Sequence, residues 1–98
     1  MTKVHVALDY DDTFTLAPSL WRVIIGHMQR AGWKVYCVSA RFDELGQRQE
    51  LQEALPDGVE IVLCDHNPKH EVTKAQGIWI DVWIDDCPWA IVGVDPPR

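Results

Sequence analysis

The chain has 98 residues, enough for one domain with one hydrophobic core. Hydrophobic residues make up 47% and charged residues 24%, which is typical of globular domains and too apolar for a disordered chain. A formal net charge of −6 argues against charge-driven binding to long nucleic acid or to anionic membranes, which requires a cationic surface.

Strands and helices are predicted to alternate along the chain. Apolar runs rich in β-branched and aromatic residues predict strands at residues 4–8, 33–38, 59–64 and 80–84. Helical periodicity and helix-stop signals predict helices at residues 19–31, 44–55 and 69–76, and a last apolar run covers 90–94. Apolar residues expected to face the core are Leu20, Ile24 and Met28 with Trp21 and Ile25 alongside, then Leu45, Leu51 and Leu55, and the tryptophans Trp33, Trp79 and Trp83. Trp21 and Trp89 are candidates for a ligand wall or a dimer face.

This order of elements indicates an α/β fold. Strands separated by helices of about a dozen residues form βαβ units, whose right-handed crossovers place helices on both faces of a parallel sheet. We therefore expect a three-layer α/β/α Rossmann-like fold with a central parallel sheet of about five strands, spanning residues 1–98 as one domain. In such sheets, ligands bind beyond the carboxyl ends of the strands.

Polar and charged side chains follow each predicted strand. They are Asp9, Asp11, Asp12 and Thr13 after the first strand, Ser39 and Arg41 after the second, Lys69 after the third, and Asp85 and Asp86 after the fourth. Several carboxylates at one sheet edge repel each other strongly unless a cation lies among them. Mg²⁺, which prefers oxygen ligands, is the natural cation for such an edge.

Two other acidic sites were compared with this pattern. An EF-hand loop fits Asp9, Asp11 and Thr13, but Phe14 stands where that loop needs glycine and Leu20 where it needs glutamate. A phosphorelay receiver also gathers acids, a hydroxyl and a lysine at one sheet edge. Its phosphorylated aspartate follows the third strand and its lysine the last, which is not the order found here.

The order of these residues resembles the haloacid dehalogenase-like phosphatase superfamily over nearly the whole chain. Residues 4–13 resemble its hhhhDxDxT motif, and residues 82–86 resemble its hhhhDD motif. Ser39 stands at the position of its second motif. The third motif is a lysine, for which Lys69 is the first choice and Lys74 the alternative.

The resemblance implies a phosphatase that works through an aspartyl-phosphate intermediate. Asp9 would be the nucleophile and Asp11 the general acid and base. The implied Mg²⁺ site consists of Asp9, the main-chain carbonyl of Asp11, Asp85 and, in its outer shell, Asp86. A phosphate dianion repels a bare carboxylate, so a metal ion and a lysine are needed to offset that repulsion.

The resemblance also implies how the phosphate is held. Ser39 would donate a hydrogen bond to the phosphoryl oxygens, and Lys69 would neutralise them and Asp9. Thr13 belongs to the first motif and is placed among the substrate-binding residues. Arg41, two residues after Ser39, is placed to contact a second phosphate or a base.

The connections are too short for the cap domain that many superfamily members carry. Five residues separate Thr13 from the predicted first helix, and four separate Cys64 from Lys69. A capless site is open, so our leading expectation is a nucleotide or a nucleic-acid phosphate end as the substrate. A small phosphorylated metabolite or a phosphoprotein is the alternative, and a homodimer could cover the open site.

Three further alternatives stay open at this point. The chain could be a non-catalytic phosphate-binding or dimerisation module of the same fold, or a phosphotransferase instead of a hydrolase. His66 and His70 could form a metal pair, although no third ligand stands nearby.

The cysteines indicate a reducing compartment. Cys37, Cys64 and Cys87 are widely spaced and form no CxxC pair, so we expect free, buried thiols and neither a disulfide nor a zinc site. No apolar run approaches the length of a membrane span, and no signal segment is evident at the start. We therefore expect a cytoplasmic protein without a membrane partner.

Overall fold

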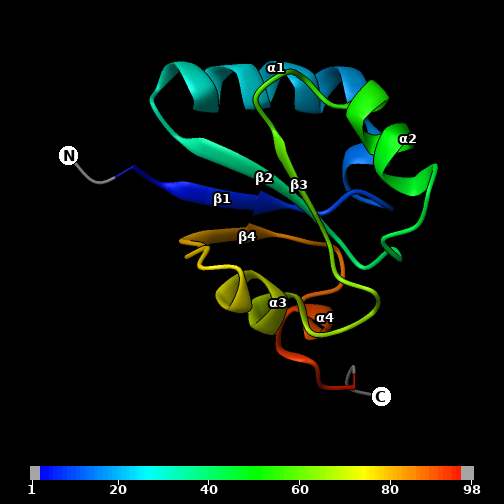
Figure 1. Ribbon diagram of the computed structural model, residues 1–98. Coiled ribbons are helices and arrows are strands. Elements are labelled where there is room, and N and C mark those ends of the chain that lie inside the picture. The colour runs from blue at the N-terminus through cyan, green and yellow to red at the C-terminus, as the bar shows by residue number, and fades with distance from the viewer. Residues whose placement is uncertain (1–2, 96–98) are drawn as a thin grey trace.

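The computed structural model describes residues 3–95. Strands and helices alternate in it as the sequence predicts (Figure 1). The elements are β1 (His5–Leu8), the 3-10 helix η1 (Phe14–Leu16), α1 (Pro18–Arg30), β2 (Lys34–Ser39), α2 (Gln47–Ala54), β3 (Glu60–Leu63), α3 (Lys69–Ala75), β4 (Val82–Ile84) and α4 (Trp89–Val92).

The strands form one parallel sheet in the order β3-β2-β1-β4, an α/β arrangement compatible with a Rossmann-like layout. The expectation of about five strands is not confirmed, because residues 3–95 contain four. Much of the last apolar run, residues 90–94, lies in α4 instead. That helix ends at Gly93, whose φ of 78° is a left-handed conformation that glycine adopts without strain.

Helices cover both faces of the sheet. Figure 1 shows α1 and α2 on one side and α3 and α4 on the other. Successive strand residues point to opposite faces, so Leu8 and Cys37 belong to the core under α1 and α2, while Ala7 and Val38 belong to the other core. The two cores fix both helical layers against the sheet, and with them the loops that connect strands to helices.

The buried face of α1 lies on one side of the predicted stripe, the side with Trp21 and Ile25. Ile25 is buried, and Trp21 and Met28 pack beside it, whereas Leu20 is 57% exposed. The spacing of Trp21, Ile25 and Met28 is as helical as that of the predicted set with Leu20 and Ile24. The larger indole is the side chain that turns inward.

The second helix begins three residues later than predicted. Gly46 has a φ of 94° and precedes the first residue of α2, so Leu45 lies in the loop and is fully exposed. Leu51 and Leu55 are buried against the sheet as expected. The prediction of Leu45 as a core anchor was therefore wrong.

The tryptophans are less buried than predicted. Trp79 is 70% exposed and Trp33 36% exposed, because both lie in the segments that lead into strands and not in the strands themselves. Trp83, within β4, packs against the core on the α3 side. Among residues 3–95, no helix has the length and apolar character needed to cross a membrane.

Candidate functional site

The sheet brings the ends of β1 and β4 together. Leu8 pairs with Ile84 in the parallel register, and the backbone N–H of Asp9 donates a hydrogen bond of 2.9 Å to the carbonyl of Ile84. Asp9 and Asp85 therefore leave the sheet side by side. On the other flank of β1, Leu8 pairs with Cys37 of β2, so Ser39 ends the adjacent strand.

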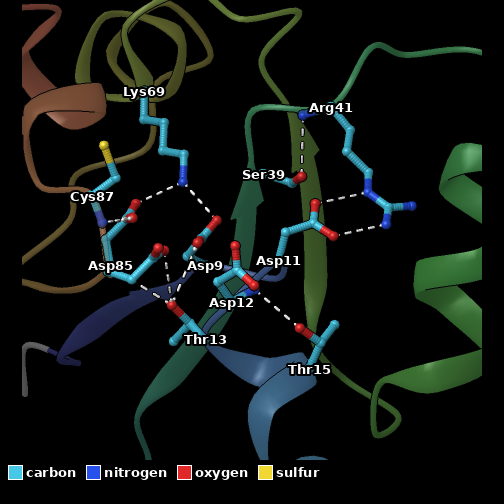
Figure 2. A network of polar contacts seen from close by, with 11 residues as sticks. Asp9, Asp11, Asp12, Thr13, Thr15, Ser39, Arg41, Lys69, Asp85 and Cys87 are labelled. Atoms are coloured by element: carbon cyan, nitrogen blue, oxygen red, sulfur yellow. Dashed lines mark hydrogen bonds and ion pairs between the residues drawn. The ribbon is translucent and has the colours of Figure 1, made fainter.

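Lys69 places its ammonium group between these two carboxylates. Its side chain is 2% exposed, and Nζ donates hydrogen bonds to Asp9 Oδ1 at 2.8 Å and Asp85 Oδ2 at 2.6 Å (Figure 2). Lys69 is the first residue of α3, which delivers it from the helical layer opposite α1. Lys74, the alternative, lies exposed in the last turn of the same helix.

Burial and charge act in opposite directions on the pKa values of this group. Burial raises the pKa of Asp9 to about 6, although the hydrogen bond and the charge of Lys69 act against it. Burial lowers the pKa of Lys69, but its hydrogen bonds to Asp85 and Asp9 outweigh burial, so its pKa is raised overall. Lys69 is therefore charged at neutral pH.

Thr13 connects the first acidic loop to Asp86. Its Oγ1 lies 3.4 Å from Asp9 Oδ2 and 3.3 Å from Asp86 Oδ1, and it accepts the backbone N–H of Asp86 at 3.3 Å. The loop is closed by a hydrogen bond of 3.3 Å from the N–H of Phe14 to the carbonyl of Asp9. The hydroxyl of Thr13 thus orients both carboxylates.

The carboxylates fit a divalent cation. Asp9, Asp85 and Asp86 each offer an oxygen, and these oxygens lie within 4.8 Å of one another. Carboxylate oxygens are the hard ligands that Mg²⁺ prefers, and one lysine ammonium does not balance three negative charges. Asp9 is buried and Asp86 is exposed, so the cluster opens to solvent on one side. The side chain of Asp11 is not part of this cluster.

Asp11 is instead clamped by Arg41. The guanidinium donates to both carboxylate oxygens of Asp11, at 2.9 Å from Nε and 2.8 Å from Nη2 (Figure 2). This bidentate hydrogen bond lowers the pKa of Asp11, so its carboxyl group is ionised at neutral pH. In this arrangement Asp11 accepts protons and has none to donate.

Both N–H donors of Arg41 Nη1 are also occupied. Nη1 donates to Glu50 Oε2 at 2.7 Å and to Gln47 Oε1 at 3.1 Å, and the guanidinium lies 5.1 Å from the centroid of the Tyr10 ring. For the predicted contact with a substrate, Arg41 therefore has its second Nη2–H, unless it releases one of these partners. Glu50 and Gln47 were missed by sequence reasoning, since only the tertiary fold brings α2 to this edge.

Ser39 lies at the predicted strand end but is completely buried. Its Oγ accepts the backbone N–H of Arg41 at 3.1 Å. The hydroxyl therefore reaches a ligand only if the side chains around it move.

A cleft of about 280 Å³ borders the carboxylate cluster. Its walls are formed by Asp12, Thr13, Leu16, Trp21, Ile84, Asp85 and Asp86. Trp21, predicted as a ligand wall, therefore lies in the wall of a cleft at this site. A larger cleft of about 350 Å³ at the start of α2 contains none of the predicted site residues.

The alternative of a metal site at His66 and His70 gains no third ligand among the described residues. His66 packs against Phe42, with ring centroids 4.8 Å apart, and the one acid, cysteine or histidine group within reach of a common metal in residues 3–95 is the aspartate cluster. The cysteines are free: Cys37 and Cys64 are buried as expected, whereas Cys87 is exposed.

Comparison of the chain with protein-family models, with curated proteins and with solved structures finds no match. The site is therefore interpreted from its own geometry.

Proposed function

We propose that this chain is a Mg²⁺-dependent phosphomonoester hydrolase of the haloacid dehalogenase-like type, with an aspartyl-phosphate intermediate. The single observation that carries the proposal is the buried Lys69, hydrogen-bonded to Asp9 and Asp85 at an edge where three carboxylate oxygens lie within 4.8 Å. Burial of an ionised carboxylate destabilises the fold unless an opposite charge lies beside it. Asp9 has Lys69 beside it, and with Asp85 and Asp86 it forms a cluster that could bind a cation.

The residues of the site suit a two-step displacement. A carboxylate oxygen of Asp9 would attack phosphorus while the bond from phosphorus to the leaving oxygen breaks, giving an acyl phosphate and an alcohol. Water would then attack phosphorus, releasing inorganic phosphate and restoring Asp9. Lys69 would keep Asp9 ionised and offset charge on the transferring group.

A magnesium ion bound by Asp9, Asp85 and Asp86 would offset the remaining negative charge of the phosphate. Thr13 holds Asp9 and Asp86 in the orientation that such binding needs, through the contacts of 3.3 and 3.4 Å.

Asp11 is the group in this proposal that must move protons. As a carboxylate held by Arg41, it is ready to take a proton from the attacking water in the second step. To protonate the leaving oxygen in the first step, it must first separate from Arg41 and gain a proton. Arg41 therefore controls which half of the reaction Asp11 serves.

We propose a nucleotide or a nucleic-acid phosphate end as the substrate, because the carboxylate cluster opens to solvent and aromatic residues lie nearby. The free thiols of Cys37, Cys64 and Cys87 suit a reducing compartment, so we place the protein in the cytoplasm.

An assay of an aryl phosphate with Mg²⁺ or with EDTA tests the activity. Turnover should require the metal and should disappear in Asp85→Asn, while Asp81→Asn, a change of an acid outside the cluster, should retain it. Mg²⁺ should also raise the melting temperature of the wild type and not of Asp85→Asn, because binding to the native state stabilises it.

A wider panel of nucleotides, phosphorylated oligonucleotides, sugar phosphates and phosphopeptides then ranks the substrates. Metal-independent turnover would contradict the mechanism. Absence of turnover on every ester, with Mg²⁺ binding intact, would favour the non-catalytic module, and transfer of phosphate to an added alcohol in preference to water would favour a phosphotransferase.

A further inference from the structure

The loops that follow β2 and β3 are joined into one unit. The N–H of Asp65 donates to the carbonyl of Arg41 at 3.1 Å, and the N–H of His66 donates to the carbonyl of Ala40 at 2.9 Å. The N–H of Asp43 donates to Asp65 Oδ1 at 2.7 Å. These bonds continue the pairing of the two strands beyond the sheet, so the loops hold a fixed geometry.

The turn after β3 is strained. Asp65 and His66 have φ values of 52° and 60°, which side-chain-bearing residues rarely adopt. The turn is closed by the N–H of Asn67, which donates to the carbonyl of Cys64 at 2.8 Å. Strain of this kind persists where the surroundings impose it, and it is concentrated at ligand-binding sites.

The joined loops present two aromatic rings to solvent. Phe42 is 48% exposed and His66 is exposed. Their ring centroids lie 4.8 Å apart at an interplanar angle of 58°, which is an aromatic contact. The pair is thus preorganised, and Phe42 still exposes about half of its residue surface to solvent.

The Phe42–His66 pair lies at the border of the candidate site. Phe42 follows Arg41, whose guanidinium holds Asp11, and stands three residues after Ser39. His66 stands three residues before Lys69. The pair is therefore carried by the same two loops that bring Arg41 to Asp11 and lead to Lys69.

We propose that Phe42 and His66 form the stacking surface for the nucleobase of a nucleoside phosphate whose phosphate lies at Asp9. This inference rests on the proposed function and names the part of the substrate that the proposal left open. Bases stack on aromatic side chains in sequence-tolerant sites that bind single strands, with a loss of about fivefold or more in affinity per stacked base removed.

The charged residues around Phe42 and His66 favour a neutral, planar group as the ligand over a second anion. Arg41 is already occupied by Asp11 and Glu50. The nearby acids Asp43 and Asp65 repel anions, but they are compatible with the amino groups of a base.

NMR titration of the Asp9→Asn variant in Mg²⁺, where the cation is kept and the proposed reaction does not run, tests the inference directly. Adenosine 5′-monophosphate should shift the ring resonances of Phe42 and His66 and bind at least fivefold more tightly than ribose 5-phosphate. Phe42→Ala should remove that difference and Phe42→Trp should retain it. His66→Asn, which tolerates the left-handed backbone, should reduce it.

Leu45→Ala is the matched control, since it removes an exposed apolar side chain from the same loop. It should leave the preference for the nucleotide unchanged. Ring resonances that do not respond to the nucleotide, or an equal loss in Leu45→Ala and Phe42→Ala, would overturn the inference.

Titration with a trinucleotide that carries a terminal phosphate distinguishes a nucleic-acid end from a free nucleotide as the ligand. Binding at least fivefold tighter than the mononucleotide would identify a nucleic-acid end, and equal or weaker binding a free nucleotide. This titration needs no turnover. Selective stacking without hydrolysis would overturn the proposed function alone, and hydrolysis without base preference would overturn the stacking surface alone.

Discussion

Asp9 and Lys69 show how one buried ion pair holds a carboxylate at the end of a strand. The pair is 2.8 Å apart, with side-chain exposures of 9% and 2%. Taking both charges out of water costs several kcal/mol per ion in general, and that cost is offset only when further hydrogen bonds satisfy each group. Lys69 finds its second acceptor in Asp85, and Asp9 finds Thr13.

Replacing Asp9 with asparagine should abolish turnover and leave the fold intact. The amide has the shape of the carboxylate but lacks the charge that attacks phosphorus. Steady-state kinetics with thermal melting as a fold control measures both effects. Asp12→Asn is the matched control, because it is exposed, lies in the same loop, and its φ of 60° suits asparagine. A near-normal rate in Asp9→Asn would remove Asp9 from the reaction.

Replacing Lys69 with methionine should destabilise the protein by about 3–5 kcal/mol at pH 7, the usual cost of leaving a buried charge unpaired. The loss should shrink as the pH falls, because Asp9 then takes up a proton and needs no partner. Urea unfolding at several pH values gives these free energies. Lys74→Met, on the exposed face of α3, should change stability by less than about 0.5 kcal/mol. Equal losses in both variants would show that Lys69 has no special role.

At the scale of elements, Arg41 ties the loop after β1 to α2. It connects Asp11 to Glu50 and Gln47, residues far apart in the sequence. Because a planar guanidinium binds both oxygens of a carboxylate at once, a lysine does not replace it.

The substitution Arg41→Lys should return the pKa of Asp11 toward its ordinary value of 3.8. A depressed pKa contributes stability above 3.8 that is lost as the pH falls through the lower native value, so wild type and variant should converge below pH 3.8. At pH 7 the difference should stay under about 1 kcal/mol, because Asp11 is half-exposed.

Arg48→Lys, on α2, is the control for that comparison, and urea unfolding across pH measures both variants. A stability difference that grows as the pH falls would contradict the assignment of the Asp11 pKa to Arg41.

Some features of the helices and strands could be predicted from the sequence, and others could not. The strands were predictable because Val6, Val38 and Val62 lie in short apolar runs with acids or hydroxyls just beyond them, and these ends mark the site. The stripe of α1 was predictable too, but not which of Leu20 and Trp21 is buried, since both fit the same helical spacing. The partners Glu50 and Gln47 of Arg41 depend on where α2 packs, which no local pattern encodes.

At the scale of the whole molecule, the cores shield two of the three thiols. Burial raises the pKa of Cys37 to about 12 and that of Cys64 to about 11. Since the thiolate is the reactive form, Cys87 should be the one thiol that a disulfide reagent labels in the native protein at pH 8.

Thiol titration before and after unfolding in guanidinium measures this difference, with Cys87→Ser as the control that removes native labelling. Rapid native labelling of Cys37 or Cys64 would show that the cores open readily.

The position of β1 between β2 and β4 has a consequence for how the protein is made. Synthesis proceeds from the amino terminus, so Asp9 leaves the ribosome long before Lys69 and Asp85, its partners in the finished fold. Until β4 emerges, the nascent chain has one edge of β1 uncovered and an aspartate without its charge partners. The order of translation therefore delays assembly of the acidic site until β4 has emerged, and a chain released before that point has Asp9 without the groups that pair with it.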